Sequence, residues 1–395
     1  MAPPFRADQV GSLIRPLSVL EANKTSSFYK EETSQSTAIQ EAIQAIVKKQ
    51  LDLGIRPITS GEFERLIFYS GLFEKLSGVV VEQLPIPDSL RPGLPLIPIF
   101  QSFGMKAHAV VVAKGRAEHK EAAYLSGWNM LRGCLPADKW KECKIALPSP
   151  TWQHLQVAKG LAFDSSVYAS DREYFLDLAR AYQQELKILY DAGLRVAQVD
   201  DPNMLFFLSE GFKDGCRTEG VDPDELIDLY IWAHNECLKN RPANFKIGVH
   251  FCRGNFPGST SVIDGLYEGI AKKLFNELDY DCFYLEFDDS RSGSFESLRH
   301  LPKGKSIVLG LVSTKTPELE NVDDLKIRVQ SAAEAISEGQ GASVEDAIRD
   351  SLAVSPQCGF ASAAGGKGIG MTEEKQWEKL TLVRDLARQM WPDAI

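Results

Sequence analysis

The sequence predicts an α/β fold, a (β/α)8 TIM barrel with a proline-rich insertion after the second strand. Segments with the patterns of a strand and of a helix alternate along the chain, and eight of the strand-like segments can be distinguished. Several of these strands are apolar on both faces, as in a buried parallel sheet. No glycine-rich dinucleotide turn follows the first strand, which disfavours the alternative, an open doubly wound sheet. With 395 residues, 44% of them hydrophobic, residues 1–395 are expected to form one domain.

The N-terminal part of the chain is expected to contain the first two strands of the barrel. The first strand is predicted over residues 7–13, a helix over 37–53 and the second strand over 55–59. The pattern then breaks in the predicted insertion, about residues 78–140. Prolines fill its first part, which reads as a loop because proline cannot lie inside a central sheet, and residues 108–113 look like an added strand.

The regular alternation of strand and helix returns after the insertion. The six further strands are predicted over residues 143–147, 195–199, 246–251, 281–287, 305–311 and 350–354. The helices are predicted over residues 171–192, 222–239, 262–277, 322–337 and 372–389. The C-terminal ends of parallel barrel strands meet at one face of the barrel, and active sites of this fold lie there.

Four potential metal ligands lie where strand-like segments end. His250 and Cys252 are two residues apart on a strand-like segment, so their side chains point to the same side. Glu286 closes a later strand and Cys358 follows the last one. Imidazole, thiolate and carboxylate together suit a tetrahedral zinc ion. The alternative is that each Cys is a small buried hydrophobe and the His a core residue, since these four residues lack the compact spacing of a zinc finger.

Other polar or aromatic residues occupy equivalent positions after the first four strands. They are Ser12, Glu62, Trp152, Asp200 and Asp201. Taken singly, the two aspartates before a proline could cap a turn, and Glu62 could be a salt-bridge partner. Trp152 could stack on a flat substrate ring or pack under the insertion. Together these residues predict a ring of side chains around a substrate.

Composition and charge restrict the class of protein. The net charge of −10 argues against a nucleic-acid partner. The chain begins without the apolar core of a secretory signal, and no segment approaches the roughly 18 apolar residues of a membrane helix. Seven Cys without a framework of close spacings fit a reducing compartment. We therefore expect a cytoplasmic protein with small-molecule substrates and no membrane partner; the oligomeric state is left open.

Several motifs resemble those of the catalytic barrel of cobalamin-independent methionine synthase, and the closest resemblance is to single-barrel proteins of this kind. The motifs are RADQVGSL at residues 6–13, SGEFER at 60–65, QVDDP at 198–202, HFC at 250–252, Glu286 and SPQCG at 355–359. They occur in the expected order through nearly the whole chain. The resemblance implies a methyltransferase of methionine biosynthesis that acts on homocysteine or a related thiol, with methylated folate as a possible donor.

The resemblance also implies roles for individual residues. His250, Cys252, Glu286 and Cys358 would bind a catalytic Zn²⁺, and Ser12, Glu62 and Asp200 would hold the amino-acid part of the thiol. A thiol with a pKa of about 8.5 is mostly protonated at neutral pH, and binding to zinc converts it to the nucleophilic thiolate. No catalytic residue beyond the zinc site is predicted.

The sequence departs from the synthase pattern after the seventh strand. The family has a His there that assists methyl transfer, whereas residues 310–318 read GLVSTKTPE and contain no His. Lys315 could pair with a substrate carboxylate or with Glu318, or could be a solvated loop residue. Asp201 takes the place of the acidic residue of the family's Asp-Glu-Pro motif. These departures favour an alternative, in which the zinc-bound thiolate takes an alkyl group from a non-folate donor or an epoxide. A second alternative is a non-catalytic barrel that zinc merely stabilises.

Overall fold

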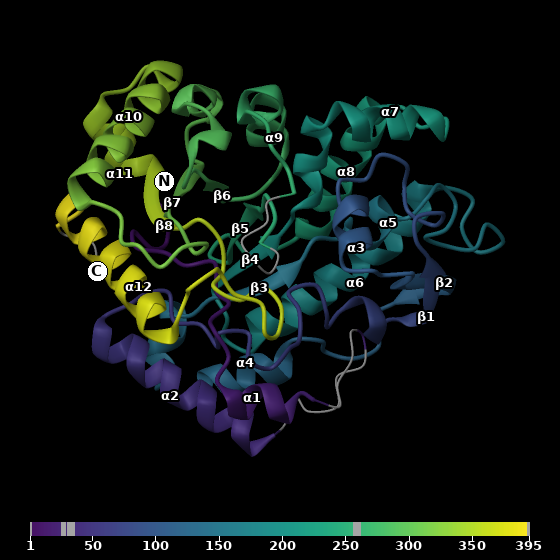
Figure 1. Cartoon of the computed structure of the whole chain (residues 1–395), viewed down its shortest axis with the longest axis horizontal. Helices are drawn as coiled ribbons and strands as arrows, with labels where there is room; N and C mark the ends of the chain where they lie inside the picture. The colour runs from purple at the N-terminus through teal and green to yellow at the C-terminus, as the bar shows by residue number, and fades with distance from the viewer. Residues whose placement is uncertain (1, 25–28, 30–35, 256–261, 393–395) are drawn as a thin grey trace.

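Six parallel strands in chain order form the central sheet of the computed structural model (Figure 1), which describes residues 2–24, 29, 36–255 and 262–392. The strands are β3 (Ile145–Pro148), β4 (Val196–Asp200), β5 (Lys246–Phe251), β6 (Cys282–Glu286), β7 (Ser306–Val312) and β8 (Leu352–Pro356). Nearly all of their residues are buried, as expected for a parallel sheet covered on both faces. These six strands agree with the predicted segments to within two residues at each end.

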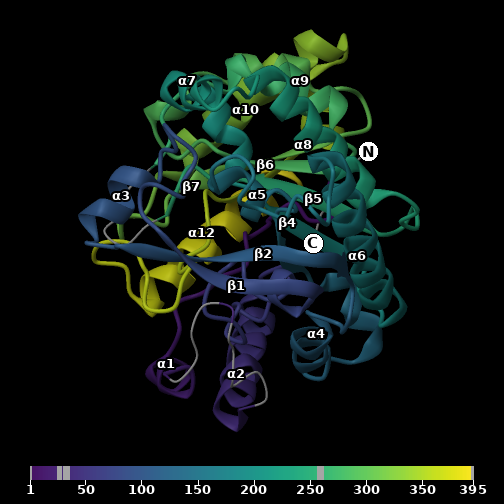
Figure 2. The same cartoon turned by 90° about the vertical axis from the view of Figure 1, so that its right-hand side faces the viewer.

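Helices surround this sheet in the two views of Figures 1 and 2. They are α1 (Leu17–Ala22), α2 (Thr37–Leu53), α3 (Ile97–Ser102), α4 (Leu125–Arg132), α5 (Trp152–Gln156), α6 (Asp171–Asp191), α7 (Glu210–Thr218), α8 (Pro223–Leu238), α9 (Ala271–Glu277), α10 (Val322–Gln340), α11 (Val344–Ser351) and α12 (Glu373–Met390). No helix in the described part of the chain combines the length and apolarity needed to cross a membrane.

The first two predicted strands are not regular strands in the structure. Residues 7–13 and 55–59 instead form isolated parallel bridges, in which Ala7 pairs with Val354 of β8 and Ile58 with Cys143 next to β3. The backbone explains the difference, since Pro57 has no N–H to donate and Gly11 has φ +134°. A third bridge joins Ser12 to Gly61. The two N-terminal segments thus lie next to the two outer strands of the six-stranded sheet.

A separate antiparallel hairpin replaces the loop predicted after residue 78. β1 (Ser77–Pro85) pairs with β2 (Ala107–Glu118), and α3 lies between them. The added strand predicted at 108–113 is confirmed as part of β2. The loop interpretation of 78–85 was wrong because Pro85 is the last residue of β1 and the other prolines follow it, so they do not interrupt the pairing. Figure 2 shows the hairpin crossing in front of the central sheet.

Two other boundaries differ from those predicted. Of the helix predicted over 262–277, only α9 and a short 3-10 turn at Tyr267–Gly269 form in the described residues, because Gly265 has φ +143°, outside the helical region. The last strand begins at Leu352 rather than at 350, since α11 continues to Ser351. Neither difference moves the strand ends that carry the potential ligands.

A buried lysine ties the N-terminal segment to the sheet interior. Lys144, which directly precedes β3, is 1% exposed. Its Nζ donates to Asp8 Oδ1 at 2.6 Å, Gln9 O at 2.5 Å, Gln198 Oε1 at 2.7 Å and Tyr284 Oη at 3.2 Å. A buried charge costs free energy unless it is paired and hydrogen-bonded, so these four contacts allow the charged Lys144 side chain to be buried.

Replacing Lys144 with Met should therefore destabilise the fold by about 3–5 kcal/mol, since the Asp8 carboxylate would stay buried without its partner. The free energy of unfolding is measured by denaturant titration. Lys187→Met is the matched control: its partner Asp191 is on the same exposed helix surface, and the expected change is about 0.5 kcal/mol or less. Equal losses for the two variants would contradict this account.

Candidate metal centre and substrate cavity

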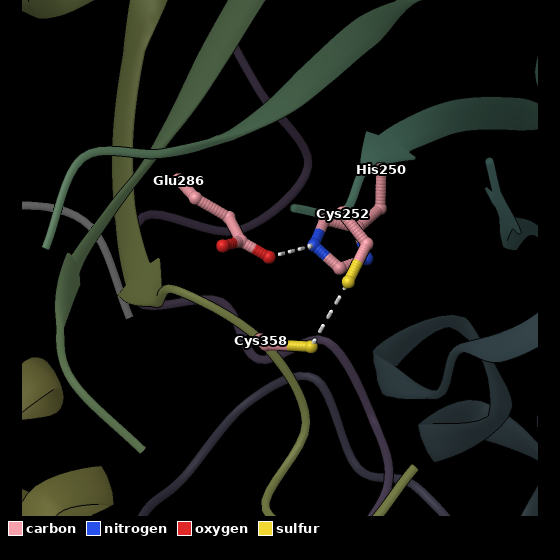
Figure 3. A group of neighbouring side chains, drawn as sticks. All are labelled: His250, Cys252, Glu286 and Cys358. Atoms are coloured by element: carbon pink, nitrogen blue, oxygen red, sulfur yellow. Dashed lines mark hydrogen bonds and ion pairs between the residues drawn. The ribbon is translucent and has the colours of Figure 1, made fainter. Parts of the chain in front are cut away.

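The four potential ligands meet at one point of the structure. One donor atom from each of His250, Cys252, Glu286 and Cys358 can be chosen so that all four lie within 4.8 Å of one another. The Cys252 and Cys358 Sγ atoms are 3.7 Å apart, and His250 Nε2 is 3.6 Å from Glu286 Oε1 (Figure 3). His250, Glu286 and Cys358 are buried, while Cys252 is partly exposed. This arrangement can hold a metal ion.

The central sheet explains why residues so far apart in sequence converge. His250 lies near the end of β5, with Cys252 just beyond it, and Glu286 is the last residue of the adjacent β6. Cys358 follows the end of β8 by two residues. Parallel strands end at the same edge, so side chains at their C-terminal ends are brought together. The backbone N–H groups of Gly254 and Arg253 donate to Cys252 Sγ and Glu286 Oε1, respectively, at 3.3 and 3.2 Å.

The donor atoms fit a cation. Among the described residues, neither His250 Nε2 nor Glu286 Oε2 has a hydrogen-bond partner, although both atoms are buried. Burial lowers the pKa of His250, but the carboxylates of Asp200 and Glu286 outweigh this effect and raise it to about 10. The neighbouring Cys358 thiol, followed by burial, raises the pKa of Cys252. The raised pKa values favour protonation of both groups, and a bound metal ion would take the place of the protons.

Asp200 contacts the potential ligand His250. Its Oδ1 lies 3.2 Å from His250 Nδ1 and also accepts a hydrogen bond from Gln198 Nε2 at 2.7 Å. Gln198 is in turn oriented by Lys144, which donates to its Oε1. A carboxylate on one imidazole nitrogen fixes the ring so that the other nitrogen faces the ion. Asp200 was predicted from the sequence as a substrate residue, and the structure adds this contact with the potential metal ligand.

A cavity of about 300 Å³ adjoins the potential ligands. His250, Cys252 and Cys358 form part of its lining, together with the three predicted substrate residues Ser12, Glu62 and Asp200. Ser12 lies close to the backbone next to Cys358: a Cβ on Gly359 would lie 1.9 Å from the Ser12 Oγ, so a larger residue at position 359 would displace the Ser12 side chain. The structure thus brings the predicted substrate residues and metal ligands to one space.

Glu62 has an unusual backbone for a non-glycine residue. Its φ is +59°, in the left-handed region, and its side chain is buried. Such conformations cost free energy and tend to occur at functional sites. Arg65 Nη2 lies 2.8 Å from Glu62 Oε1. Burial raises the pKa of Glu62, and the charge of Arg65 opposes this shift. The arrangement directs a carboxylate into the cavity with Arg65 beside it.

Of the three candidate substrate or donor contacts, Trp152 lines the cavity. It is 8% exposed and stacks on Tyr69, with ring centroids 4.7 Å apart. Asp201 is bound elsewhere: it is fully buried, with Oδ2 2.9 Å from His234 Nε2 and 3.0 Å from Ser149 Oγ. Its Oδ1 accepts from the backbone of the turn that follows, so Asp201 acts as the cap considered in the sequence.

Lys315 lies beside the potential metal centre. Its Nζ is 3.3 Å from Asp288 Oδ2, 3.9 Å from Asp289 Oδ2 and 4.0 Å from Glu286 Oε2. It is 5% exposed and is therefore not a solvated loop lysine. Burial raises the pKa of Asp288, and Lys315 opposes that shift. The pair with Asp288 was not predicted, because no spacing signal connects the loops after β6 and β7.

Sequence reasoning also missed most of the cavity wall. Residues of the described chain that contribute aromatic or aliphatic side chains to it include Tyr29, Phe68, Tyr69, Leu96, Phe100 and Phe206. Tyr29 lies between α1 and α2, and the others come from the segment after Glu62, from the hairpin region with α3 and from the turn after β4. Only the run of apolar residues after Glu62 could have drawn attention to this wall.

Comparisons with known proteins identify a family model that matches the chain and several similar proteins. The family model "Cobalamin-independent synthase, Catalytic domain" matches residues 164–376. The proteins YxjH and YxjG of Bacillus subtilis (strain 168) are each 34% identical over 98% of this chain and 95% of their own length. A 5-methyltetrahydropteroyltriglutamate–homocysteine methyltransferase of Bacillus licheniformis is 22% identical over 82% of this chain, which corresponds to 35% of that protein.

One solved structure has a similar fold over the whole chain. It is a B12-independent methionine synthase from Shewanella sp. W3-18-1 in complex with selenomethionine, with a TM-score of 0.68. The match covers 98% of each chain at 19% sequence identity. At this identity the likeness concerns the fold.

Proposed function

The chain belongs to the cobalamin-independent methionine synthase family and is a methyltransferase, and we propose that it uses zinc to transfer a methyl group to the sulfur of homocysteine or a related thiol. The observation that carries the proposal is the convergence of His250, Cys252, Glu286 and Cys358 beside the cavity that Ser12 lines. Two thiolates, an imidazole and a carboxylate suit zinc. Bound there, zinc would supply the acidity that keeps a substrate thiol in its reactive thiolate form.

The residues of the chain would bind and orient the thiol. Glu62 and Asp200 offer carboxylates to the ammonium group of an amino acid, and Ser12 offers a hydroxyl. Asp200 would at the same time hold the His250 ring through Nδ1. The bridges of residues 7 and 58 to the outer strands support a closed eight-stranded barrel for residues 1–395, with residues 78–140 as its insertion. In a closed barrel, Ser12 and Glu62 would complete the ring around the substrate.

Thiol activation can be tested without knowledge of the natural donor. The zinc-loaded protein is incubated with homocysteine and methyl iodide, and the methylated product is quantified by mass spectrometry. We expect faster methylation than in solution, and a smaller acceleration with simple thiols that lack the amino acid. No acceleration with any thiol, in protein that contains zinc, would overturn the proposed function.

Methylfolate should be a poor donor for this chain. The segment after β7 has Ser313 and Lys315 where the family has its His, and both side chains contact Asp288. General acid assistance typically contributes 10²- to 10⁴-fold, and a lysine with an ordinary pKa near 10.4 is a weak replacement for imidazole. The rate of methionine formation from methyltetrahydrofolate and homocysteine measures this expectation.

The variants Ser313→His and Lys315→His test the cause. If the missing proton donor limits the reaction, one of them should raise turnover with methylfolate, while Lys326→His on the exposed surface of α10 should not. Turnover by the unaltered protein on the order of the 1–10³ s⁻¹ seen across enzymes would show that methylfolate is a good donor after all.

A further inference from the structure

The part of the cavity beyond the predicted amino-acid site is mostly apolar. Its wall includes Phe68, Tyr69, Leu96, Phe100, Trp152 and Phe206. A volume of about 300 Å³ is at the low end of the range for small-molecule sites. Ser12, Glu62 and Asp200 belong to the amino-acid end, so the aromatic end remains for the methyl donor. The chemistry of this wall therefore bears on the class of donor.

Three of the rings hold one another in place. Tyr69 and Trp152 are stacked, with centroids 4.7 Å apart and planes 21° apart. Phe68 meets both edge-on, at 5.1 Å from Tyr69 and 5.0 Å from Trp152. Contacts of this kind fix ring orientation, so the wall is preorganised. The faces of aromatic rings attract cations, and methylated onium groups are recognised in this way.

The charged side chains of the cavity lining also bear on whether a cationic or an anionic donor would bind. Among the described residues that line it, the carboxylates are Glu62 and Asp200, and there is no Lys or Arg. Arg65 offsets the charge of Glu62 through their contact at 2.8 Å. The wall residue His108 is buried, which lowers its pKa to about 4, so it is uncharged at neutral pH. An anionic donor would meet no Lys or Arg among the described lining residues, whereas a cationic group at the aromatic end would meet ring faces and no positively charged side chain.

Provided that the proposed thiol methylation is correct, we propose that the methyl donor is a methylsulfonium compound whose cationic group lies along the wall of Phe68, Tyr69 and Trp152. In the reaction, the bond between the donor sulfur and its methyl carbon breaks, and the electron pair remains on the donor sulfur. A bond forms between that carbon and the acceptor thiolate. The thiol has lost its proton to solvent beforehand, so a sulfonium and a thiol give two thioethers and one proton.

This donor class also explains why the segment after β7 can lack a His. A folate donor must be protonated at nitrogen before its methyl group leaves, whereas a sulfonium leaves as a neutral thioether and requires no proton. Lys315 is engaged by Asp288 at 3.3 Å, in agreement with a reaction that makes no demand on it. Transfer from a cation to a thiolate also neutralises charge, which is favourable in a site shielded from water.

Binding is tested by titration calorimetry of the zinc-loaded full chain without a thiol acceptor. The probes are trimethylsulfonium, its neutral counterpart dimethyl sulfide, and tetrahydrofolate with three glutamates. Cation–π attraction predicts that trimethylsulfonium binds roughly two- to thirtyfold more tightly than dimethyl sulfide. The folate, whose glutamates are anionic, is expected to bind more weakly than trimethylsulfonium, because the described lining contains no Lys or Arg. Equal affinity for the charged and neutral probes would overturn the proposal.

Variants locate the effect on the aromatic wall. Phe68→Leu and Trp152→Leu should abolish most of the preference for the charged probe, whereas Trp152→Phe should retain it. Phe68 is only partly buried, so its variant is expected to fold even if Trp152→Leu is not. Tyr190→Leu is the control, because Tyr190 is not among the described residues that line the cavity. Loss of preference in the control as well, or in none of the variants, would contradict the assignment.

Turnover measurements with different methyl donors distinguish the sulfonium proposal from the more general proposal of thiol methylation. Homocysteine is offered S-methylmethionine with a deuterated methyl group or methyltetrahydrofolate, and labelled methionine is followed by mass. At least tenfold faster transfer from the sulfonium is expected. If methyl iodide is used but S-methylmethionine is not, the sulfonium proposal fails while thiol methylation stands. If methyl iodide gives no acceleration either, thiol activation itself is wrong.

Discussion

Zinc should be lost from the protein when Cys252 or Cys358 is replaced with serine, and methyl transfer should be lost with it. A serine hydroxyl is not deprotonated at neutral pH and is a poor zinc ligand, so either change leaves three donors. Loss of a supporting contact outside the ligands typically lowers metal affinity 10- to 100-fold, and loss of a ligand should exceed that. Metal analysis of freshly purified protein, prepared without chelators, should give about one zinc per chain before substitution and almost none after it.

A matched control is available within the chain. Cys134 is a partly exposed free cysteine two residues after α4, and Cys134→Ser should leave the zinc content unchanged. Both zinc-deficient variants should keep their circular dichroism spectrum, because the sheet and its helices form the core independently of the metal, unlike in a zinc finger. Unsubstituted protein without zinc would refute the metal assignment, and unfolding of both variants would mean that the metal is structural.

Glu62→Gln and Asp200→Asn should both weaken binding of an amino-acid thiol, but only the second should also weaken zinc binding. A charge-assisted hydrogen bond to an ammonium group contributes about 1.5–3 kcal/mol, so the affinity for homocysteine should fall about ten- to a hundredfold in each variant. The structure adds the difference: Asp200 accepts from His250 Nδ1, whereas Glu62 pairs with Arg65. Zinc affinity should fall about tenfold or more in Asp200→Asn.

Calorimetric titration with homocysteine and with a simple thiol that lacks the amino group measures the first effect, and competition with a chelator measures the second. The simple thiol should bind Glu62→Gln as it binds the unaltered protein. Asp191→Asn, on the exposed face of α6, serves as the control for the amide substitution. Equal losses for the two thiols would show that these carboxylates do not recognise an ammonium group.

The convergence of the four potential ligands could be predicted from the sequence, because it depends on where strands end. His250 lies in β5 and Cys252 follows it with the same two-residue period, while Glu286 ends one apolar run and Cys358 follows another, both with the pattern of buried strands. The first two strands were overestimated, since a single proline or a glycine with positive φ suffices to reduce an extended segment to isolated bridges. Ser12, in the first of these segments, and Glu62, three residues after the second, nevertheless line the cavity.

The aromatic wall could not be predicted in the same way. Phe68, Trp152 and Phe100 belong to segments whose meeting depends on how β1, β2 and α3 fold back toward the sheet. No periodicity in the sequence encodes that approach. The second contact of Asp200 was also hidden, because a hydrogen bond between neighbouring strands requires their register, and residue 200 is opposite residue 250 only in the structure.

The bridge between the N-terminal segment and β8 has a consequence for the order of folding. Arg6 reaches the carbonyl of Leu352, 346 positions later in the chain, and Ala7 pairs with Val354. Closing so large a loop costs conformational entropy, and contacts of long sequence separation form slowly. On the ribosome, Ser12 must wait for Cys358 to emerge before the two can face the same substrate. The potential metal centre can thus assemble only after Cys358 has been synthesised.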